Sequence, residues 1–113
     1  MKSPWPQEIV PTKGVRITVG RSSKHDVTVK HVAVSGTHFA LQFVDGQLAV
    51  EDLDSRYGTF VNGARVKNSL LQPGDMLKFA NSPLYIFKNG RLMLQKEGVG
   101  MEVRLENVGL ERS

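Results

Sequence analysis

Residues 39–51 read FALQFVDGQLAVE, in which the pair Asp45-Gly46 separates two short runs of alternating side chains. An Asp-Gly or Asn-Gly pair favours a two-residue hairpin turn, because both of its residues adopt positive φ at little cost. Alternation between apolar and polar side chains is typical of a strand with one buried face. The stretch therefore predicts a β-hairpin.

The same signal recurs along the chain. Asn62-Gly63 and Asn89-Gly90 also separate strand-like runs, and Pro73-Gly74 suits the centre of a type II turn. No segment of a dozen residues has the periodicity of an amphipathic helix. Many short strands joined by frequent turns predict an all-β antiparallel sandwich or barrel, with functional residues on the loops at one end. The residues expected to face its core are Val15, Ile17, Val19, Phe39, Leu41, Phe43, Phe60, Leu77 and Phe79.

Length and composition limit the class of protein. With 113 residues the chain has room for one domain, and its longest apolar runs are far too short to span a membrane as a helix. The absence of cysteine excludes disulfides, thiolate zinc sites and cysteine nucleophiles, and it suits the cytoplasm. No secretory signal is visible at the start of the sequence. We expect a cytoplasmic protein in which residues 15–95 form the domain and residues 1–14, with three prolines, form a loosely held lead-in.

A net charge of +4 at pH 7 favours an anionic partner. Nucleic acid, a membrane surface and a phosphorylated protein all satisfy this condition. Single-strand binders interleave basic residues with exposed aromatic residues, whereas most of the phenylalanines here are expected in the core. We therefore expect no nucleic acid as a partner.

Three short motifs occur in order on the predicted strand ends. They are Gly20-Arg21, a Ser-x-x-His motif from Ser35 to His38, and the segment SRYGTFVNG at residues 55–63. With these motifs, about residues 15–87 resemble the forkhead-associated (FHA) domain family. The family pattern is Gly-Arg, then Ser-x-x-His, then Ser-x-Asn-Gly-Thr-x-Val-Asn-Gly.

The resemblance implies a phosphothreonine-binding antiparallel β-sandwich of the FHA/SMAD type, with about eleven short strands. It implies that Arg21 and Ser35 bind the phosphate directly and that Arg56 lies where it also touches the phosphate. It gives His38 a structural role, buried and bonded to the backbone, so that the Ser35 loop is held in place. The remaining residues implied at the phosphopeptide edge are Gly36, Tyr57 and Asn62, and those implied to be structural are Gly20, Gly58 and Gly63.

The residue types also suit this ligand on chemical grounds. Phosphothreonine carries about −1.5 to −2 charges and three acceptor oxygens, so its site needs guanidinium and hydroxyl or backbone N–H donors. Arg21, Ser35 and Arg56 supply them.

The sequence departs from the family pattern at three places. Tyr57 stands where the family has the asparagine that bonds the peptide backbone, and a phenol cannot reproduce the two-sided bonding of a carboxamide. On this basis Tyr57→Asn is expected to tighten phosphopeptide binding. Gly36 replaces a residue that is often Arg or Asn, which removes one phosphate ligand. Lys30-His31 makes the rim more positive than in relatives with an acidic loop.

Two other kinds of chemistry are disfavoured. Ser35, His38 and Asp52 resemble the members of a hydrolase triad, but no Gly-x-Ser-x-Gly elbow surrounds the serine. A metal site built on His25 and His31 would place a cation beside lysines. We therefore expect no catalytic residue, no metal and no cofactor.

The interpretation that follows is a non-enzymatic module that recruits phosphothreonine-containing proteins to its parent protein. The alternative is an FHA-like interaction or structural domain that does not depend on phosphate.

Residues 96–113 form either a linker or a last strand of the sandwich. Within them, MEVRLENV at residues 101–108 looks like the opening strand of ABC-transporter nucleotide-binding domains, some of which follow an FHA domain in bacteria. No Gly-x-x-x-x-Gly-Lys-Ser/Thr loop occurs in these 113 residues, so this chain alone cannot hydrolyse ATP. From the motif at residues 101–108, the parent protein is expected to be an ABC-type ATPase. The domain would then lie at the inner face of a membrane and would not itself insert into the membrane.

Overall fold

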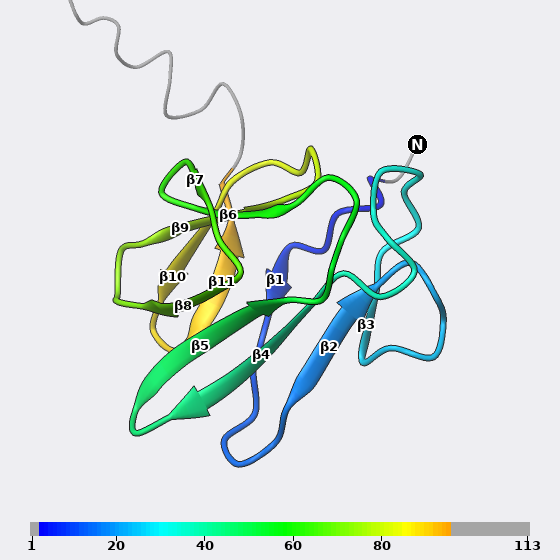
Figure 1. Ribbon diagram of the computed structural model, residues 1–113. Helices are drawn as coiled ribbons and strands as arrows, with labels where there is room; N and C mark the ends of the chain where they lie inside the picture. The colour runs from blue at the N-terminus through cyan, green and yellow to red at the C-terminus, as the bar shows by residue number, and fades with distance from the viewer. Residues whose placement is uncertain (1–2, 96–113) are drawn as a thin grey trace, which may run out of the picture.

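The computed structural model describes residues 3–95, which form eleven β-strands arranged in two packed sheets (Figure 1). The six-stranded sheet contains, in spatial order, β1 (Glu8–Ile9), β11 (Arg91–Leu94), β10 (Tyr85–Lys88), β9 (Met76–Phe79), β6 (Thr59–Val61) and β7 (Ala64–Arg65). The five-stranded sheet contains β3 (Val27–Thr28), β2 (Ile17–Gly20), β4 (Phe39–Val44), β5 (Gln47–Asp52) and β8 (Asn68–Leu71). The all-β sandwich predicted from the sequence is confirmed. Within residues 3–95 there is no helix long and apolar enough to cross a membrane.

All three Asx-Gly hairpins form as predicted. Asp45 and Gly46, between β4 and β5, have φ values of 51° and 82°. Residues 62–63 and 89–90 also have positive φ at both positions, and each pair joins two antiparallel neighbours. The predicted turn at Pro73-Gly74 is also present, with Gly74 at φ 95° and the Asp75 N–H donating to the Gln72 carbonyl. Short-range turn chemistry therefore determines the connections β4–β5, β6–β7 and β10–β11 within the sheets and the connection from β8 to β9 between them.

One strand pair departs from the antiparallel rule. The two-residue strand β3 runs parallel to β2, with Val19 opposite Val27. Its neighbour Val29 donates its N–H back to the Gly20 carbonyl. The segment after β2 thus folds back along the end of that strand, which brings the following loop close to Arg21.

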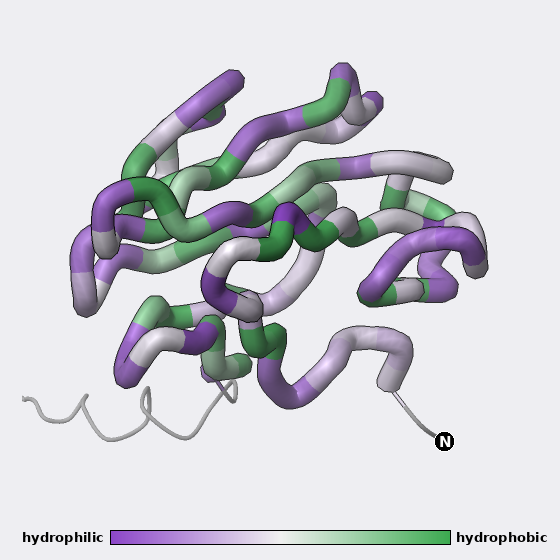
Figure 2. The backbone as a smooth tube through the Cα atoms, turned by 90° about the horizontal axis from the view of Figure 1, so that it is seen from below, coloured by the Kyte–Doolittle hydropathy of each residue, from purple (hydrophilic) through white to green (hydrophobic). Residues whose placement is uncertain are grey.

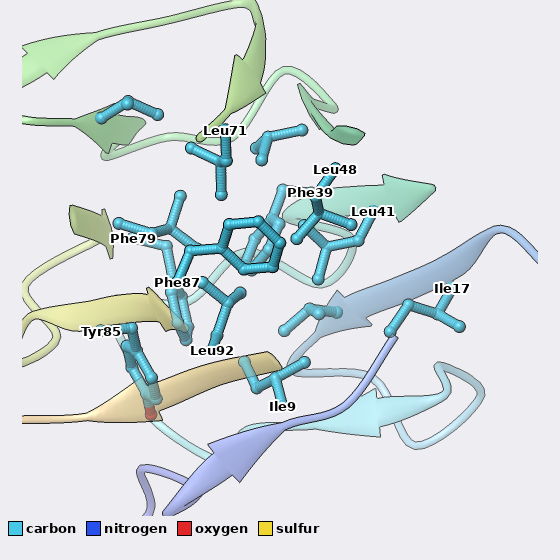
Figure 3. Packing of buried hydrophobic residues seen from close by; sticks show 14 of the residues in the cluster. Ile9, Ile17, Phe39, Leu41, Leu48, Leu71, Phe79, Tyr85, Phe87 and Leu92 are labelled. Carbon is cyan, nitrogen blue, oxygen red and sulfur yellow. The ribbon is translucent and has the colours of Figure 1, made fainter. Parts of the chain in front are cut away.

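The core lies between the two sheets. Figure 3 shows side chains from both layers meeting there, and the rings of Phe39 in β4 and Phe79 in β9 are 4.9 Å apart between centroids. In Figure 2 apolar residues lie along the strands, while polar residues concentrate at turns and loops. This is the distribution that a two-layer sandwich requires.

Two residues that were expected in the core lie outside it. Val15 is exposed, because β2 begins only at Ile17 and the preceding residues form a surface turn. Phe60 is half-buried on the outer face of the six-stranded sheet. Its neighbours Thr59 and Val61 take the two inward positions of β6, so alternation directs Phe60 outward.

Within the expected loosely held lead-in at residues 1–14, residues 5–9 are instead held in place by the fold. Glu8–Ile9 pair with β11, and the side chain of Ile9 is only 1% exposed among the core residues of Figure 3. The Tyr85 hydroxyl donates to the Pro6 carbonyl at 2.7 Å, and Trp5 packs edge-on against Phe79. Burial of this hydroxyl raises the pKa of Tyr85. The edge of β11 gives the segment a partner at Glu8–Ile9.

Ile9→Ala is expected to lower the free energy of unfolding by about 2 to 5 kcal/mol, because it leaves a cavity between the sheets. The matched control is Val10→Ala, since Val10 is the next residue and is 51% exposed. Denaturant unfolding of both variants measures the difference. Equal, small losses would contradict the packing of this segment into the core.

Candidate functional site

Most of the predicted site residues, among them Arg21, Ser35 and Arg56, lie on three loops at one end of the sandwich, toward the upper right of Figure 1. These are the β2–β3, β3–β4 and β5–β6 loops. The Arg21 N–H donates to the Ser35 carbonyl at 2.9 Å, and the Ser22 N–H donates to the Gly36 carbonyl at 3.2 Å. The first two loops are therefore joined along their backbones at the residues that carry the candidate side chains.

Gly20 makes this close approach possible. A Cβ atom at that position would overlap the Gly36 carbonyl oxygen and approach the His25 ring to 2.7 Å. Gly36 itself faces open space. The glycine of the Gly-Arg pair thus allows the β3–β4 loop to approach closely. The arginine that follows it is a candidate binding residue.

His38 joins the second loop to the third. Its side chain is fully buried, its Nδ1 accepts the Ser35 N–H at 3.1 Å, and its Nε2 donates to the Gly58 carbonyl at 2.9 Å. Burial lowers the pKa of His38, and this outweighs the opposing effects of the Gly58 carbonyl and of Asp52. The ring is therefore neutral at neutral pH, with its proton on Nε2. This agrees with the structural role that the family resemblance implied.

The third loop is anchored by Asp52, at the end of β5. Its carboxylate accepts the Ser55 hydroxyl at 2.6 Å, the Ser55 N–H at 3.1 Å and the Thr59 hydroxyl at 2.7 Å. Burial alone would raise the pKa of Asp52, but these hydrogen bonds outweigh it and lower the pKa below its ordinary value. Asp52 is therefore ionised and central to the shape of the loop.

From the sequence, Asp52 is expected only as a possible triad member, and this structural role is not predicted. An Asp at a strand end with a Ser three residues later is a local turn signal that could have indicated it. At the far end of the loop, Gly58 has a φ of 91°, and the Arg65 guanidinium packs against it where a Cβ atom would lie. Both features hold the backbone of residues 55–58 in one conformation.

Arg21, Ser35 and Arg56 are brought together by these contacts. The Ser35 Oγ accepts the Arg56 N–H at 2.9 Å, so its own hydroxyl proton remains to be donated elsewhere. The Arg21 guanidinium donates to the Val32 carbonyl at 3.3 Å, and the Arg56 guanidinium lies 5.3 Å from the centre of the Tyr57 ring. The salt bridges within residues 3–95 include neither Arg21 nor Arg56. Arg21 and Arg56 therefore carry two positive charges, without a salt-bridge partner in residues 3–95, on loops whose backbones meet at Ser35.

Asn62 is not part of this cluster. It occupies the hairpin turn after β6 with a φ of 50°, where its amide donates to Asp75 at 3.1 Å and accepts the Met76 N–H at 2.9 Å. The neighbouring Gly63 completes the turn. Because both ends of its amide are bonded within the fold, we assign Asn62 a structural role in place of the expected contact with a peptide.

The other histidines also have structural partners. His25 bridges the hydroxyls of Thr18 and Thr37 at 2.9 Å each, and His31 accepts the Ala33 N–H through Nδ1. No group of three or more His, Cys, Asp or Glu side chains within residues 3–95 is placed to hold a metal ion.

The hydrogen bonds do not form a hydrolase triad either. The His38 ring bonds the backbone N–H of Ser35 and not its hydroxyl, and the carboxylate of Asp52 bonds Ser55 and Thr59. No proton relay from Ser35 through His38 to Asp52 is therefore formed.

A protein-family model described as FHA domain matches residues 17–80. This chain belongs to the FHA domain family. The match includes all three of the loops that carry the site.

A relative with 36% identity over 94 residues is the ABC transporter ATP-binding/permease protein Rv1747 of Mycobacterium tuberculosis. The match covers 78% of this chain and 11% of the relative, so the chain spans about a tenth of the transporter's length. The solved FHA-2 domain of the same transporter is 32% identical, with a TM-score of 0.61, over 86% of this chain and 90% of that domain.

Two more distant solved structures share the fold. The FHA domain of the Chlamydia trachomatis protein CT664 has a TM-score of 0.61 at 20% identity, over 75% of this chain and 81% of that one. The MEK1 FHA domain, solved with a phosphothreonine peptide of HOP1, has a TM-score of 0.57 at 22% identity, over 80% of this chain and 94% of that one.

The lowered pKa of His38 predicts that the FHA domain loses stability in mild acid. Below about pH 6.5 the unfolded chain takes up a proton that the folded ring binds less readily, so the free energy of unfolding decreases as the pH falls. Denaturant unfolding at pH 7.5 and 5.5 measures this change.

The control is His38→Asn, whose carboxamide can accept and donate but does not titrate in this range. It should be less stable at pH 7.5 and lose less of its stability between the two pH values. An equal loss in the variant and the native domain would exclude His38 as the cause.

Proposed function

We propose that this FHA domain binds protein segments phosphorylated on threonine, with Arg21, Ser35 and Arg56 holding the phosphate. The observation that carries the proposal is the cluster itself, in which a serine hydroxyl and two guanidinium groups that form no salt bridge within residues 3–95 stand on three loops bonded to one another. A doubly charged phosphate with three acceptor oxygens is complementary to this donor set.

The loops are ordered by contacts that require no ligand. The hydrogen bonds of His38 and Asp52 are internal to the domain and fully or largely buried. Binding then needs little further ordering of the backbone, which reduces its entropic cost. The Ser35 hydroxyl proton and the guanidinium N–H groups are the donors that a phosphate oxygen would accept.

The related structures support threonine as the phosphorylated residue. The solved MEK1 FHA domain holds a phosphothreonine peptide, and another solved relative of this fold is described by its phosphothreonine-dependent interactions. We extend this ligand class to the present chain on the strength of the shared family and of the site geometry.

For the wider context, we propose that the domain recruits a phosphorylated segment to a bacterial ABC-type transporter, at the cytoplasmic face of the membrane. The support is the 36% identity to the mycobacterial transporter protein. The role is binding without catalysis. The transporter-like motif at residues 101–108, and the expected linker or last strand at residues 96–113, lie outside the described residues.

Arg21→Ala is expected to weaken binding of a phosphothreonine peptide by about 1.5 to 3 kcal/mol, roughly tenfold to 150-fold, because it removes charged hydrogen bonds. Peptides are selected from a library with fixed phosphothreonine, and affinity is measured by fluorescence polarisation. The matched control is Arg16→Ala. Arg16 is exposed, precedes β2 at its other end and pairs with Glu51.

The same peptides without phosphate should bind at least a hundredfold more weakly. Equal binding of both forms would favour the alternative, an interaction domain that does not depend on phosphate. An equal effect of Arg16→Ala and Arg21→Ala would show that only the net charge of the domain matters.

A further inference from the structure

Trp5 lies outside residues 17–80, the range that the family model matches, yet it contacts one of the three loops of the site. Its ring lies against that of His31 in the β3–β4 loop, with 4.7 Å between the ring centroids and 31° between the ring planes. The beginning of the described chain, dark blue in Figure 1, accordingly lies beside this loop. The loop also carries Ser35, so Trp5 supports a segment that holds a candidate phosphate ligand.

The position of Trp5 is fixed by the six-stranded sheet. Its ring meets Phe79 in β9 edge-on, with 5.6 Å between the ring centroids. The carbonyl of the next residue, Pro6, accepts the Tyr85 hydroxyl from β10 at 2.7 Å. Farther along, Ile9 is buried in the core where β1 pairs with β11. Trp5 is therefore held on the sheet and offers a fixed surface against which a loop can pack.

His31 links this ring contact to the backbone of its loop. Its Nδ1 accepts the Ala33 N–H at 3.0 Å, and its carbonyl accepts the Val34 N–H at 3.0 Å. Its own N–H donates to the Val29 carbonyl at 2.9 Å. The orientation of the His31 ring is therefore coupled to the shape of the turn at residues 31–34.

The same turn holds the guanidinium of Arg21. The Val32 carbonyl accepts that group at 3.3 Å. The Val32 side chain is 83% exposed, so its own packing does little to keep the carbonyl in place. The salt bridges within residues 3–95 do not include Arg21, so none of them orients its guanidinium instead. The direction of this group thus depends on the turn, and the turn rests on Trp5 through His31.

Filling of the core does not account for both contacts of Trp5. Its contact with Phe79 places it against the cluster of buried residues, whereas its contact with His31 is made to a half-buried residue of a loop. Aromatic pairs in such geometries stabilise a structure beyond the effect of the area that they bury. The two contacts can be separated by experiment, because His31 can be replaced while Phe79 is left in place.

We propose that Trp5 is a positioning residue for phosphothreonine binding, which supports the β3–β4 loop through His31 and so keeps the Arg21 guanidinium where it meets the phosphate. This role rests on the phosphothreonine binding proposed above. Trp5 itself touches no ligand. The unit that binds the phosphopeptide then includes a residue of the lead-in, outside residues 17–80.

The test measures the affinity of Trp5→Leu and Trp5→Phe for one phosphothreonine peptide, selected from the library with the native domain. Trp5→Leu keeps an apolar side chain but loses the aromatic contact, so it should weaken binding by about threefold to tenfold. Trp5→Phe keeps an aromatic ring beside His31 and should bind within about twofold of the native domain. Fluorescence polarisation gives the dissociation constants.

Two further variants separate positioning from stability, and denaturant unfolding of every variant is recorded alongside. Ile9→Val loosens the same segment in the core without removing an aromatic ring, so it should lower the free energy of unfolding and leave the peptide affinity unchanged. His31→Ala removes the loop side of the contact and should weaken binding by itself. Adding Trp5→Leu to His31→Ala should cause no further loss, because the two residues act as one pair.

The outcomes separate this role from the proposed function. Native affinity in Trp5→Leu, equal weakening by Trp5→Phe or Ile9→Val, or an undiminished effect of Trp5→Leu in the His31→Ala background overturns the role of Trp5 and leaves the phosphate site standing. If Trp5→Leu does not fold, unchanged binding by His31→Ala leads to the same conclusion. Both proposals fail if the native domain binds no phosphopeptide, or binds unphosphorylated peptides equally well.

Discussion

The arrangement of the binding end depends on the buried ring of His38. One of its nitrogens accepts the Ser35 N–H and the other donates to the Gly58 carbonyl, so a single side chain fixes the distance between two loops. A neutral imidazole is suited to this position because it offers one donor and one acceptor on opposite sides of a rigid ring. Protonation would turn the acceptor into a second donor, facing the donor N–H of Ser35. Burial lowers the pKa of His38 and so disfavours its protonation. The buried environment therefore keeps the ring in the neutral form that these two hydrogen bonds require.

Around this ring, the buried residues that hold the loops in place are different from the exposed residues that are proposed to contact the ligand. Asp52, Ser55 and Thr59 form a buried network that shapes the third loop without reaching the surface. Arg21 and Arg56 project from the supported loops and pair with no carboxylate within residues 3–95. Charged groups held by a satisfied polar network can attract a phosphate without first breaking internal salt bridges.

Local chemistry explains which parts of the fold could be predicted. The hairpins at Asp45-Gly46 and Asn62-Gly63 depend on two residues each, and both form as expected. The neighbouring positions of Arg21 and Ser35 followed from family resemblance, since nothing in the spacing of two residues so far apart determines their contact. The order of the three motifs predicted a common site because the three loops that carry them lie at the same end of the sandwich.

The errors have a common cause in long-range packing. The place of Ile9 depends on β11, which lies more than eighty residues later, so the local prolines suggested a loose segment that is in fact part of a sheet. The direction of Phe60 depends on which face of β6 meets the other sheet, and one residue of register reverses it. The amide of Asn62 is bonded by Asp75 and Met76, across the turn that precedes β9. None of these contacts can be read from neighbouring residues.

The central claim is that a neutral His38, protonated on Nε2, holds the loops in one arrangement before and after the ligand binds. Long-range ¹H–¹⁵N NMR spectra of the imidazole nitrogens at pH 7, recorded without and with a phosphothreonine peptide, test it most directly. The account predicts the Nε2–H tautomer in both states, with the largest ligand-induced shifts at the backbone amides of Arg21, Ser35 and Arg56. A protonated ring, an Nδ1–H tautomer, or a change of tautomer on binding would contradict it.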